Sequence, residues 1–153
     1  MIGVGEKAPD FELPDQDGNP VRLADFAGRK VVLYFYPKAD TPGCTLQACG
    51  IRDHRGDYDE AGAVVLGVSP DEPGQLRRFA DKYGLAFTLL GDTDHRVAEA
   101  YGVWVEKSMR GRRYFGNQRA TFVIDEGGVV RHVIPKASPK THDGEVLKAL
   151  ARL

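Results

Sequence analysis

The sequence predicts an α/β fold, with a sheet covered by helices on both faces, and three observations support it. Two near-continuous apolar runs, "KVVLYFYP" at 30–37 and "AVVLGVSP" at 63–70, are typical of strands buried on both faces of a parallel sheet. A helical pattern follows each run before the next strand begins. No internal repeat, low-complexity tract or Ser/Gly linker divides the chain, so residues 1–153 are expected to form a single domain.

The N-terminal part begins with extended structure. "FELPDQDGNPVRL" at 11–23 predicts two short strands around a turn at Asp17-Gly18. After the first buried strand, a helical stretch is expected from about Thr41 to Ala61, because a residue of the favoured capping type marks its start.

The middle of the chain predicts two helices with a strand between them. "EPGQLRRFADKYG" at 72–84 predicts a helix with one apolar face, ended by Gly84. "AFTLLGD" at 86–92 predicts a strand, and "DHRVAEAYG" at 94–102 a short helix that Asp94 caps and the final glycine ends.

The C-terminal part predicts a hairpin and a closing helix. "RATFVIDEGGVVRHVI" at 119–134 is typical of two strands that turn at Gly127-Gly128. "THDGEVLKALARL" at 141–153 predicts an amphipathic helix that packs its apolar face on the rest of the domain.

The segment before this hairpin, "VEKSMRGRRYFGNQR" at 105–119, is predicted to be a loop and is locally basic. Such a cluster could bind a polyanion, but the net charge of −1 favours a solvated loop. The basic residues, opposed only by Glu106, are Lys107, Arg110, Arg112, Arg113 and Arg119.

Composition narrows the class of protein. Apolar residues make up 42% and charged residues 28%, as in ordinary globular domains, and the near-neutral net charge predicts no binding to nucleic acid or to an anionic membrane. No apolar run approaches the roughly 20 residues that span a bilayer, and the start lacks the pattern of a secretory signal. A cytoplasmic protein is expected.

The stretch "YPKADTPGCTLQACG" at 36–50 holds both cysteines of the chain. If Thr41 is the N-cap residue, Pro42 takes the first helical position and Cys44 the third. Backbone N–H groups without partners and the positive end of the helix dipole favour a thiolate there. An inert buried cysteine is the alternative, but a strand-to-helix junction at a sheet edge favours a reactive one.

The second cysteine, Cys49, lies five residues after Cys44. In a straight helix this spacing means about 7.5 Å of rise and a rotation of about 140°, which sets the two Cα atoms roughly 8–9 Å apart. A disulfide needs less than about 7 Å. The pair therefore cannot bond while the helix is intact, and a bond formed at one stage of a catalytic cycle fits better than a static structural disulfide.

Metal binding and a cysteine–histidine dyad were the other possibilities for this stretch. Cys44, Cys49 and His54 recur every five residues and so scatter around a helix, which disfavours a zinc site. A dyad would need a histidine from elsewhere in the chain, and the sequence alone places none near Cys44. The other histidines are His95, His132 and His142.

Arg119 opens "RATFVID", a predicted strand start. As a parallel neighbour of the first buried strand, this strand is expected to bring Arg119 to the sheet edge of Cys44. A guanidinium there would stabilise a thiolate and polarise an oxygen substrate through its fork of donors.

These residues together carry a family resemblance. "YPKADTPGCTLQACGIRD" closely resembles the active-site segment of the peroxiredoxins, in particular the bacterioferritin-comigratory protein or PrxQ subfamily. The signature Pro-x-x-x-Thr-x-x-Cys is met by Pro37, Thr41 and Cys44; the subfamily's resolving cysteine matches Cys49, and its arginine before a Thr-Phe strand matches Arg119. The resemblance covers nearly the whole chain.

The resemblance implies a thioredoxin-like fold, a central mixed sheet flanked by helices, with an N-terminal β-hairpin extension. It implies a thiol peroxidase that reduces hydrogen peroxide and organic hydroperoxides through a Cys44 sulfenic acid and a Cys44–Cys49 disulfide. Arg119 and Thr41 would bind the peroxide oxygens, and Pro37 would limit water access. It also implies a thioredoxin- or glutaredoxin-type reductant, a monomer, no metal and no cofactor.

Two rival functions use the same cysteine pair. A thioredoxin-like disulfide oxidoreductase normally has C-x-x-C and a proline directly before the strand threonine, whereas here Ala120 precedes Thr121. A non-enzymatic redox sensor or holdase would react once with peroxide and not turn over.

Overall fold

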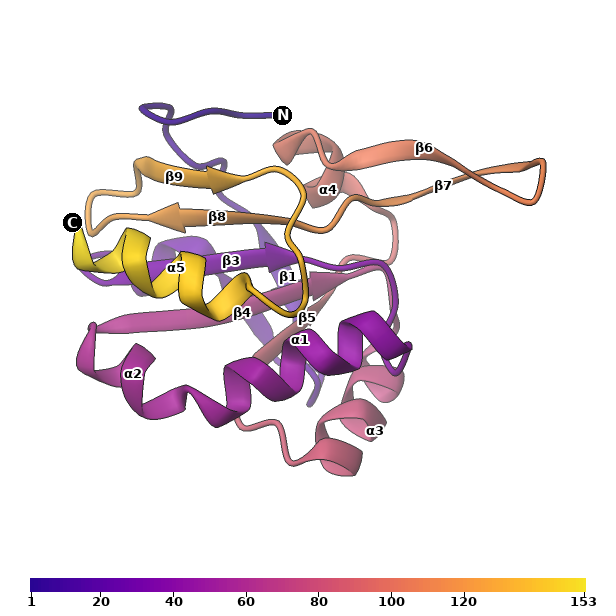
Figure 1. The fold of residues 1–153 in the computed structure, drawn as a ribbon, viewed down its shortest axis with the longest axis horizontal. Coiled ribbons are helices and arrows are strands. Elements are labelled where there is room, and N and C mark those ends of the chain that lie inside the picture. The colour runs from indigo at the N-terminus through magenta and orange to yellow at the C-terminus, as the bar shows by residue number, and fades with distance from the viewer.

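The central element is a five-stranded mixed sheet with strand order β5-β4-β3-β8-β9, seen in a computed structural model that describes residues 1–153 (Figure 1). Strands β3, β4 and β5 run parallel to one another, while β8 pairs antiparallel with β3 and β9 antiparallel with β8. The predicted mixed sheet is therefore confirmed. The strands span Lys30–Phe35 (β3), Ala63–Ser69 (β4), Thr88–Gly91 (β5), Ala120–Ile124 (β8) and Val130–Ile134 (β9).

Two layers of elements cover the two faces of this sheet. Helices α1, α2, α3 and α5 pack on one face, with α1 and α5 in front of the sheet in Figure 1, and α4 packs on the other with the N-terminal segment. Strand β3 serves both layers, because Val32 and Tyr34 join the first core and Leu33 and Phe35 the second. The helices span Pro42–Asp53 (α1), Arg55–Glu60 (α2), Pro73–Tyr83 (α3), Arg96–Tyr101 (α4) and His142–Ala151 (α5).

The N-terminal hairpin extension is also present. Strands β1 (Glu12–Pro14) and β2 (Pro20–Arg22) pair antiparallel, and a short 3-10 helix at Leu23–Phe26 follows. The side chain of Gln16 attaches the turn to the main sheet, because it donates to the Phe87 carbonyl and accepts from the Leu89 N–H.

The predicted helix from Thr41 to Ala61 is two helices, which corrects its continuity. Helix α1 ends at Asp53 and α2 begins at Arg55, with His54 between them at φ −100° and ψ 16°. The His54 Nδ1 atom lies 2.9 Å from the Gly50 carbonyl oxygen, so this side chain occupies an acceptor at the helix end. Neither glycine nor proline marks the break at this position in the sequence.

The cap of α4 is a second correction. Asp94, the predicted cap, accepts only the N–H of Arg96, at 3.4 Å, whereas the carboxylate of Asp92 accepts the N–H groups of Val97 and Ala98, at 3.2 and 2.9 Å. The end of the helix is as predicted, because Gly102 adopts φ 73°.

The basic segment predicted to be a loop is instead a third hairpin. Strands β6 (Trp104–Met109) and β7 (Arg112–Asn117) pair antiparallel and project away from the body of the molecule (Figure 1). Arg110 and Gly111, both at positive φ, form the two-residue turn. The ribbon is exposed on most of its surface, so no apolar alternation marks it in the sequence.

The remaining elements follow the predictions. Helix α3 buries Leu76, Phe79 and Ala80 and ends at Gly84, which is left-handed at φ 63°. Strands β8 and β9 form the predicted hairpin, and α5 closes the chain. None of the helices is long and apolar enough to cross a membrane.

Candidate functional site

The site is built where β3 ends and α1 begins. Thr41 is the N-cap residue with extended backbone, φ −96° and ψ 157°, and Pro42 is the first helical residue, so Cys44 takes the third position as predicted. The Cys44 side chain is buried, 2% exposed, in the core that packs on this face of the sheet. Both cysteines are free thiols.

Thr41 caps the helix with its backbone alone. Its carbonyl accepts the N–H of Thr45 at 2.8 Å, but its hydroxyl donates to the Lys38 carbonyl, also at 2.8 Å, instead of bonding to the first turn. No side chain caps the first N–H groups of α1. These donors around Cys44 therefore remain available for a negative charge.

Arg119 reaches this site through a strand pairing opposite to the predicted one. Strand β8 is antiparallel to β3, with Ala120 opposite Phe35, whereas a parallel neighbour was expected. Because an antiparallel strand begins where its neighbour ends, this pairing is the one that brings Arg119 to the Cys44 edge of the sheet.

The guanidinium of Arg119 spans the first turns of α1 on both sides of Cys44 in the sequence. Its Nη1 donates to Oε1 of Gln47 at 2.8 Å, and Gln47 is itself buried. On the other side, a Cβ added to Gly43 would lie 3.0 Å from Nη2, so glycine lets the guanidinium approach the helix backbone. The sequence argument identified Arg119 and missed Gln47 and Gly43.

Asn117 is a further residue that sequence reasoning missed. It is buried at the end of β7, and its Nδ2 donates to the carbonyls of Tyr36 at 3.2 Å and of Val68 at 3.5 Å. The amide thus joins the ends of β3 and β4 directly before Pro37, which is half-buried. Asn117 lay in the segment predicted to be a loop, where no signal distinguished it.

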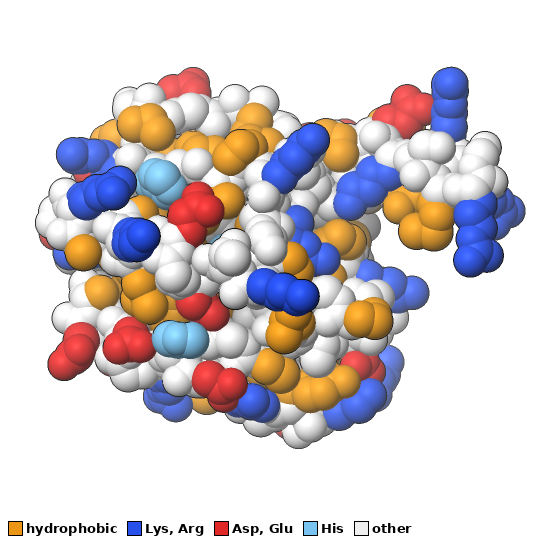
Figure 2. Space-filling view, viewed as in Figure 1, with side chains coloured by type: hydrophobic (Ala, Val, Ile, Leu, Met, Phe, Trp, Pro, Cys, Tyr) orange, Lys and Arg blue, Asp and Glu red, His pale blue; other side chains and the backbone are white.

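The β6–β7 hairpin supplies a second cation. Lys107 is half-buried, and its Nζ donates to the Asn117 carbonyl. Burial lowers the pKa of Lys107, the charge of Arg119 lowers it further, and the charge of Cys44 opposes both. Figure 2 shows that the surface between the body and the hairpin is hollowed and that lysine and arginine side chains border it.

Two tyrosines lie in the same core as Cys44. Tyr34 and Tyr36 are buried and stacked, with ring centroids 5.3 Å apart. Burial raises the pKa of each phenol above its usual value, and the neighbouring Cys44 charge adds to this. Both therefore stay neutral and add no negative charge beside the thiol.

His142 is the histidine nearest to this chemistry, but it forms no dyad with Cys44. It is buried, and its Nε2 lies 2.8 Å from Oγ1 of Thr121. Burial lowers the pKa of His142 to about 4, with a smaller contribution from the charge of Arg119. It is thus a neutral partner of β8, the strand that follows Arg119.

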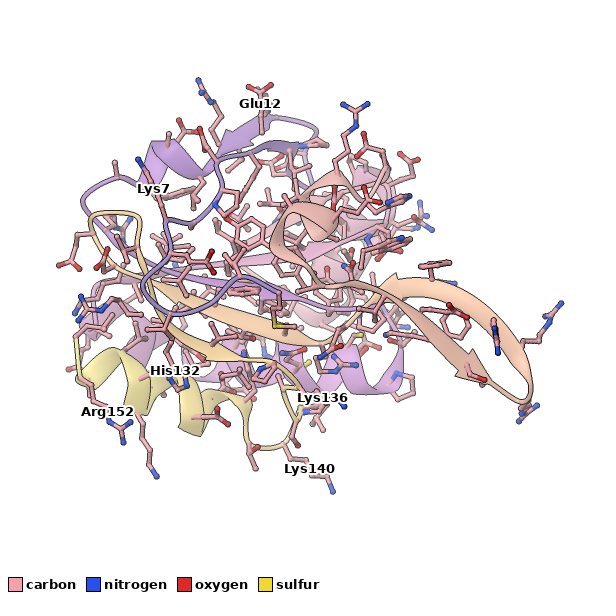
Figure 3. The ribbon with its side chains drawn as sticks, turned by 90° about the horizontal axis from the view of Figure 1, so that it is seen from above. Lys7, Glu12, His132, Lys136, Lys140 and Arg152 are labelled. Atoms are coloured by element: carbon pink, nitrogen blue, oxygen red, sulfur yellow. The ribbon has the colours of Figure 1, made fainter.

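The other histidines lie elsewhere. His95 stacks on Trp104, with ring centroids 4.1 Å apart. His132 of β9 has its Nε2 3.6 Å from Glu145 of α5, the helix over which it lies in Figure 3. His54 faces Gly50 and Asp143.

Cys49 lies half-buried on α1, which is one unbroken helix from residue 42 to 53. The structure places Thr41 at the N-cap before Cys44 and Arg119 against Gly43 in the same turn, and Pro37 follows the end of β3. It leaves Cys49 separated from Cys44 by more than a helical turn, as the spacing predicted. A cleft of about 410 Å³ at the other end of α1, lined by Ile51, Tyr58 and Phe87 among others, holds neither cysteine.

Comparisons with known proteins identify the family of this chain. The profile described as the AhpC/TSA family matches residues 4–133. Peroxiredoxin Bcp of Escherichia coli K12 is 52% identical over 149 residues, covering 97% of this chain and 96% of that protein. The crystal structure of peroxidoxin BcpB from Mycobacterium tuberculosis matches with a TM-score of 0.90 and 36% identity, over 100% of this chain and 99% of that one.

A third comparison concerns activity. The bacterioferritin comigratory protein of Xanthomonas campestris, whose structures were described for alkyl peroxide reduction, matches with a TM-score of 0.88 and 35% identity, over 93% of this chain and 90% of that one. The family profile and these relatives extend over nearly the whole chain. The chain therefore belongs to the AhpC/TSA family, as a peroxiredoxin of the Bcp/PrxQ group, and is a thiol peroxidase that works through a cysteine disulfide intermediate.

Proposed function

We propose that Cys44 is the peroxidatic cysteine and Cys49 the resolving cysteine of this peroxidase. The Cys44 thiolate attacks one oxygen of a hydroperoxide; an S–O bond forms, the O–O bond breaks, and the other oxygen leaves with a proton as water or alcohol. Cys49 then attacks the sulfenic sulfur, water leaves, and a Cys44–Cys49 disulfide forms. A dithiol reductant exchanges with this disulfide and restores both thiols.

The observation that carries the assignment is the position of Arg119 over the first turns of α1. Its Nη1 is fixed by Gln47 and its Nη2 lies against Gly43, which puts the guanidinium beside the helical turn that carries Cys44. Donors fixed in advance stabilise the charge that moves onto the leaving oxygen without reorganising. The cation near Cys49 is Arg52, which donates to Asp53 and to the Tyr83 carbonyl at the exposed surface and not to a buried side chain.

Thr41 and Pro37 complete the proposed peroxide site. The Thr41 hydroxyl gives its proton to the Lys38 carbonyl, which leaves its oxygen lone pairs free to accept the O–H of a hydroperoxide. Pro37 follows the buried Tyr36 and is itself half-buried. In this position it limits water access to the sulfur.

We assign hydrogen peroxide and organic hydroperoxides as substrates and a thioredoxin- or glutaredoxin-type dithiol as reductant. Alkyl peroxide reduction, described for the Xanthomonas campestris relative, supports the organic substrates. We further propose a monomer that acts in the cytoplasm and folds as a single domain over residues 1–153. One sheet with a packed core on each face supports the single domain.

The test is a thioredoxin-coupled peroxidase assay on the wild type, Cys44→Ser and Cys49→Ser. We expect steady turnover by the wild type, no peroxide consumption by Cys44→Ser, and about one equivalent consumed per chain by Cys49→Ser because its sulfenic acid cannot be resolved. Full activity of Cys44→Ser would refute the roles. A single stoichiometric reaction of the wild type would indicate a redox sensor instead.

A further inference from the structure

Asp143, in the first turn of α5, contacts the half of α1 that carries Cys49. Its side chain is only 12% exposed. Oδ1 accepts a hydrogen bond from the Tyr58 hydroxyl of α2, and Oδ2 lies 3.5 Å from Nδ1 of His54. The carboxylate thus joins α5 to α2 and to the junction between α1 and α2.

The same carboxylate lies against the backbone of Gly50, the residue directly after Cys49. A Cβ added to Gly50 would lie 2.5 Å from Oδ2 of Asp143, closer than real Cβ contacts, so the close approach depends on glycine. The Gly50 carbonyl oxygen is held in turn, 2.9 Å from Nδ1 of His54. We call Gly50, His54, Tyr58 and Asp143 the Cys49 latch.

The latch must resist the movement that the disulfide requires. Residues 44–49 have to leave the helical conformation before the two sulfurs can bond, because five residues of helix hold the Cα atoms too far apart. Gly50 shares a peptide bond with Cys49, so displacing Cys49 moves Gly50 away from Asp143 and His54. The contacts of the latch are therefore made in the reduced helix and lost on unwinding.

The charges of His54 and Asp143 attract each other in the latch, whereas burial of Asp143 opposes its charged form. Burial raises the pKa of Asp143, and the Tyr58 hydrogen bond and the His54 charge oppose this, whereas the nearby Asp53 adds to it. The pKa of His54 is raised mainly by the Gly50 carbonyl and also by Asp143, Asp57 and Asp53. His54 and Asp143 thus favour each other's charged forms.

We propose that the Cys49 latch holds α1 in its reduced, helical state and so sets the rate at which Cys49 is released to resolve the Cys44 sulfenic acid. Tyr58, His54 and Asp143 are positioning residues in this inference, which rests on the proposed roles of the two cysteines. A purely structural latch would stabilise the fold and leave the rate of the resolving step unchanged.

The test compares Tyr58→Phe with Tyr101→Phe. Each variant removes one tyrosine hydroxyl bond, since the Tyr101 hydroxyl donates to the Pro9 carbonyl on the other side of the sheet. After one equivalent of peroxide, rapid quenching measures the Cys44 sulfenic acid and the disulfide separately. We expect disulfide formation to be roughly three- to tenfold faster in Tyr58→Phe, which is the rate change that corresponds to the net free energy of one hydrogen bond. The rate of sulfenic acid formation should be unchanged. Tyr101→Phe should match the wild type in both steps.

The redox equilibrium gives a second readout. Loss of the latch destabilises the reduced form relative to the disulfide, so the reduction potential of Tyr58→Phe should be more negative by about 15 to 30 mV, the same fold-change converted for a two-electron couple. Asp143→Ala removes the shared acceptor and should act in the same direction, which keeps the test valid if one variant fails to fold.

The outcomes separate this inference from the proposed function. Disulfide formation at the wild-type rate in both Tyr58→Phe and Asp143→Ala would overturn the latch while leaving the cysteine roles intact. Equal acceleration in Tyr101→Phe would also overturn it, because the effect would then follow general loss of stability. Absence of a Cys44 sulfenic acid in the wild type would instead refute the proposed function.

Discussion

The two ends of helix α1 have different surroundings, although the helix is only twelve residues long. At the start, Cys44 is buried and Arg119 is fixed beside it by the buried Gln47. At the far end, Cys49 is half-buried and the helix contacts a small polar cluster centred on Asp143. One helix thus has a cation fixed against its first turns and a polar cluster against the turn that follows Cys49.

This difference matches the two chemical tasks. A nucleophile that attacks peroxide gains from donors fixed in advance, because they need not reorganise as charge moves. A cysteine that must travel to its partner needs a segment that opens at low free energy. The contrast teaches that the structure separates the two demands along one helix.

Arg119→Ala should produce the largest effect that is confined to the first end. We expect the second-order rate constant with hydrogen peroxide to fall by roughly 10²–10³, the cost of losing one set of preorganised donors. The rate of disulfide formation from the sulfenic acid should stay near the wild-type value. Arg119→Lys is the matched control and should recover only part of the loss, since an ammonium lacks the planar fork. An unchanged peroxide rate constant would remove Arg119 from the site.

His142 and His54 should make the free energy of unfolding depend on pH with opposite signs. Burial lowers the pKa of His142 to about 4, so unfolding takes up a proton between about pH 6.5 and 4 and the free energy of unfolding falls as the pH falls. The shift corresponds to about 3 kcal/mol across that window. The free energy of unfolding, measured with denaturant at several pH values, should therefore fall less steeply with falling pH in His142→Gln than in the wild type.

His54 provides the contrast. The Gly50 carbonyl raises the pKa of His54, so its stabilising effect is present below its ordinary pKa and is lost as the pH rises through the folded value. The His54 side chain is 46% exposed, and solvent screens its charge, so His54→Gln should change the same unfolding curves only slightly. For His142, the same fall in the free energy of unfolding at acid pH in the wild type and in His142→Gln would contradict its assignment as a buried neutral histidine.

Gln47→Ala should give the smallest effect at the first end. The buried amide fixes Arg119 without touching the sulfur, so we expect the peroxide rate constant to fall by about tenfold, the value of a hydrogen bond to a charged group. Leu46→Ala, an exposed neighbour on the same helix, is the control and should leave the rate constant unchanged. A similar loss in both variants would indicate a general disturbance of α1.

Much of the fold and the start of the site could be predicted because the signals are local. The two apolar runs identified β3 and β4, and Thr41 with Pro42 placed Cys44 in the third helical position, where the structure has it. The spacing of Cys44 and Cys49 predicted their separation in the reduced helix. Each of these inferences depends only on neighbours in the sequence.

The rest of the site depends on contacts between distant segments. Arg119 lies at the predicted edge of the sheet, but the strand after it runs antiparallel to β3 and not parallel as predicted. The pattern of residues within one strand does not show the direction of its neighbour. Lys107 and Asn117 were hidden in a charged segment whose exposed hairpin carries no apolar alternation. Asp143 lies almost a hundred positions from Gly50, so no local pattern could join them.

Hydrogen exchange along α1 in the reduced and the disulfide forms tests the central claim most directly. The backbone amides of residues 45–49 should be protected in the reduced enzyme and exchange rapidly in the disulfide form, because the helix between the cysteines must unwind. The amides of β3 serve as the internal control and should stay protected in both forms. Equal protection of residues 45–49 in the two forms would contradict the account.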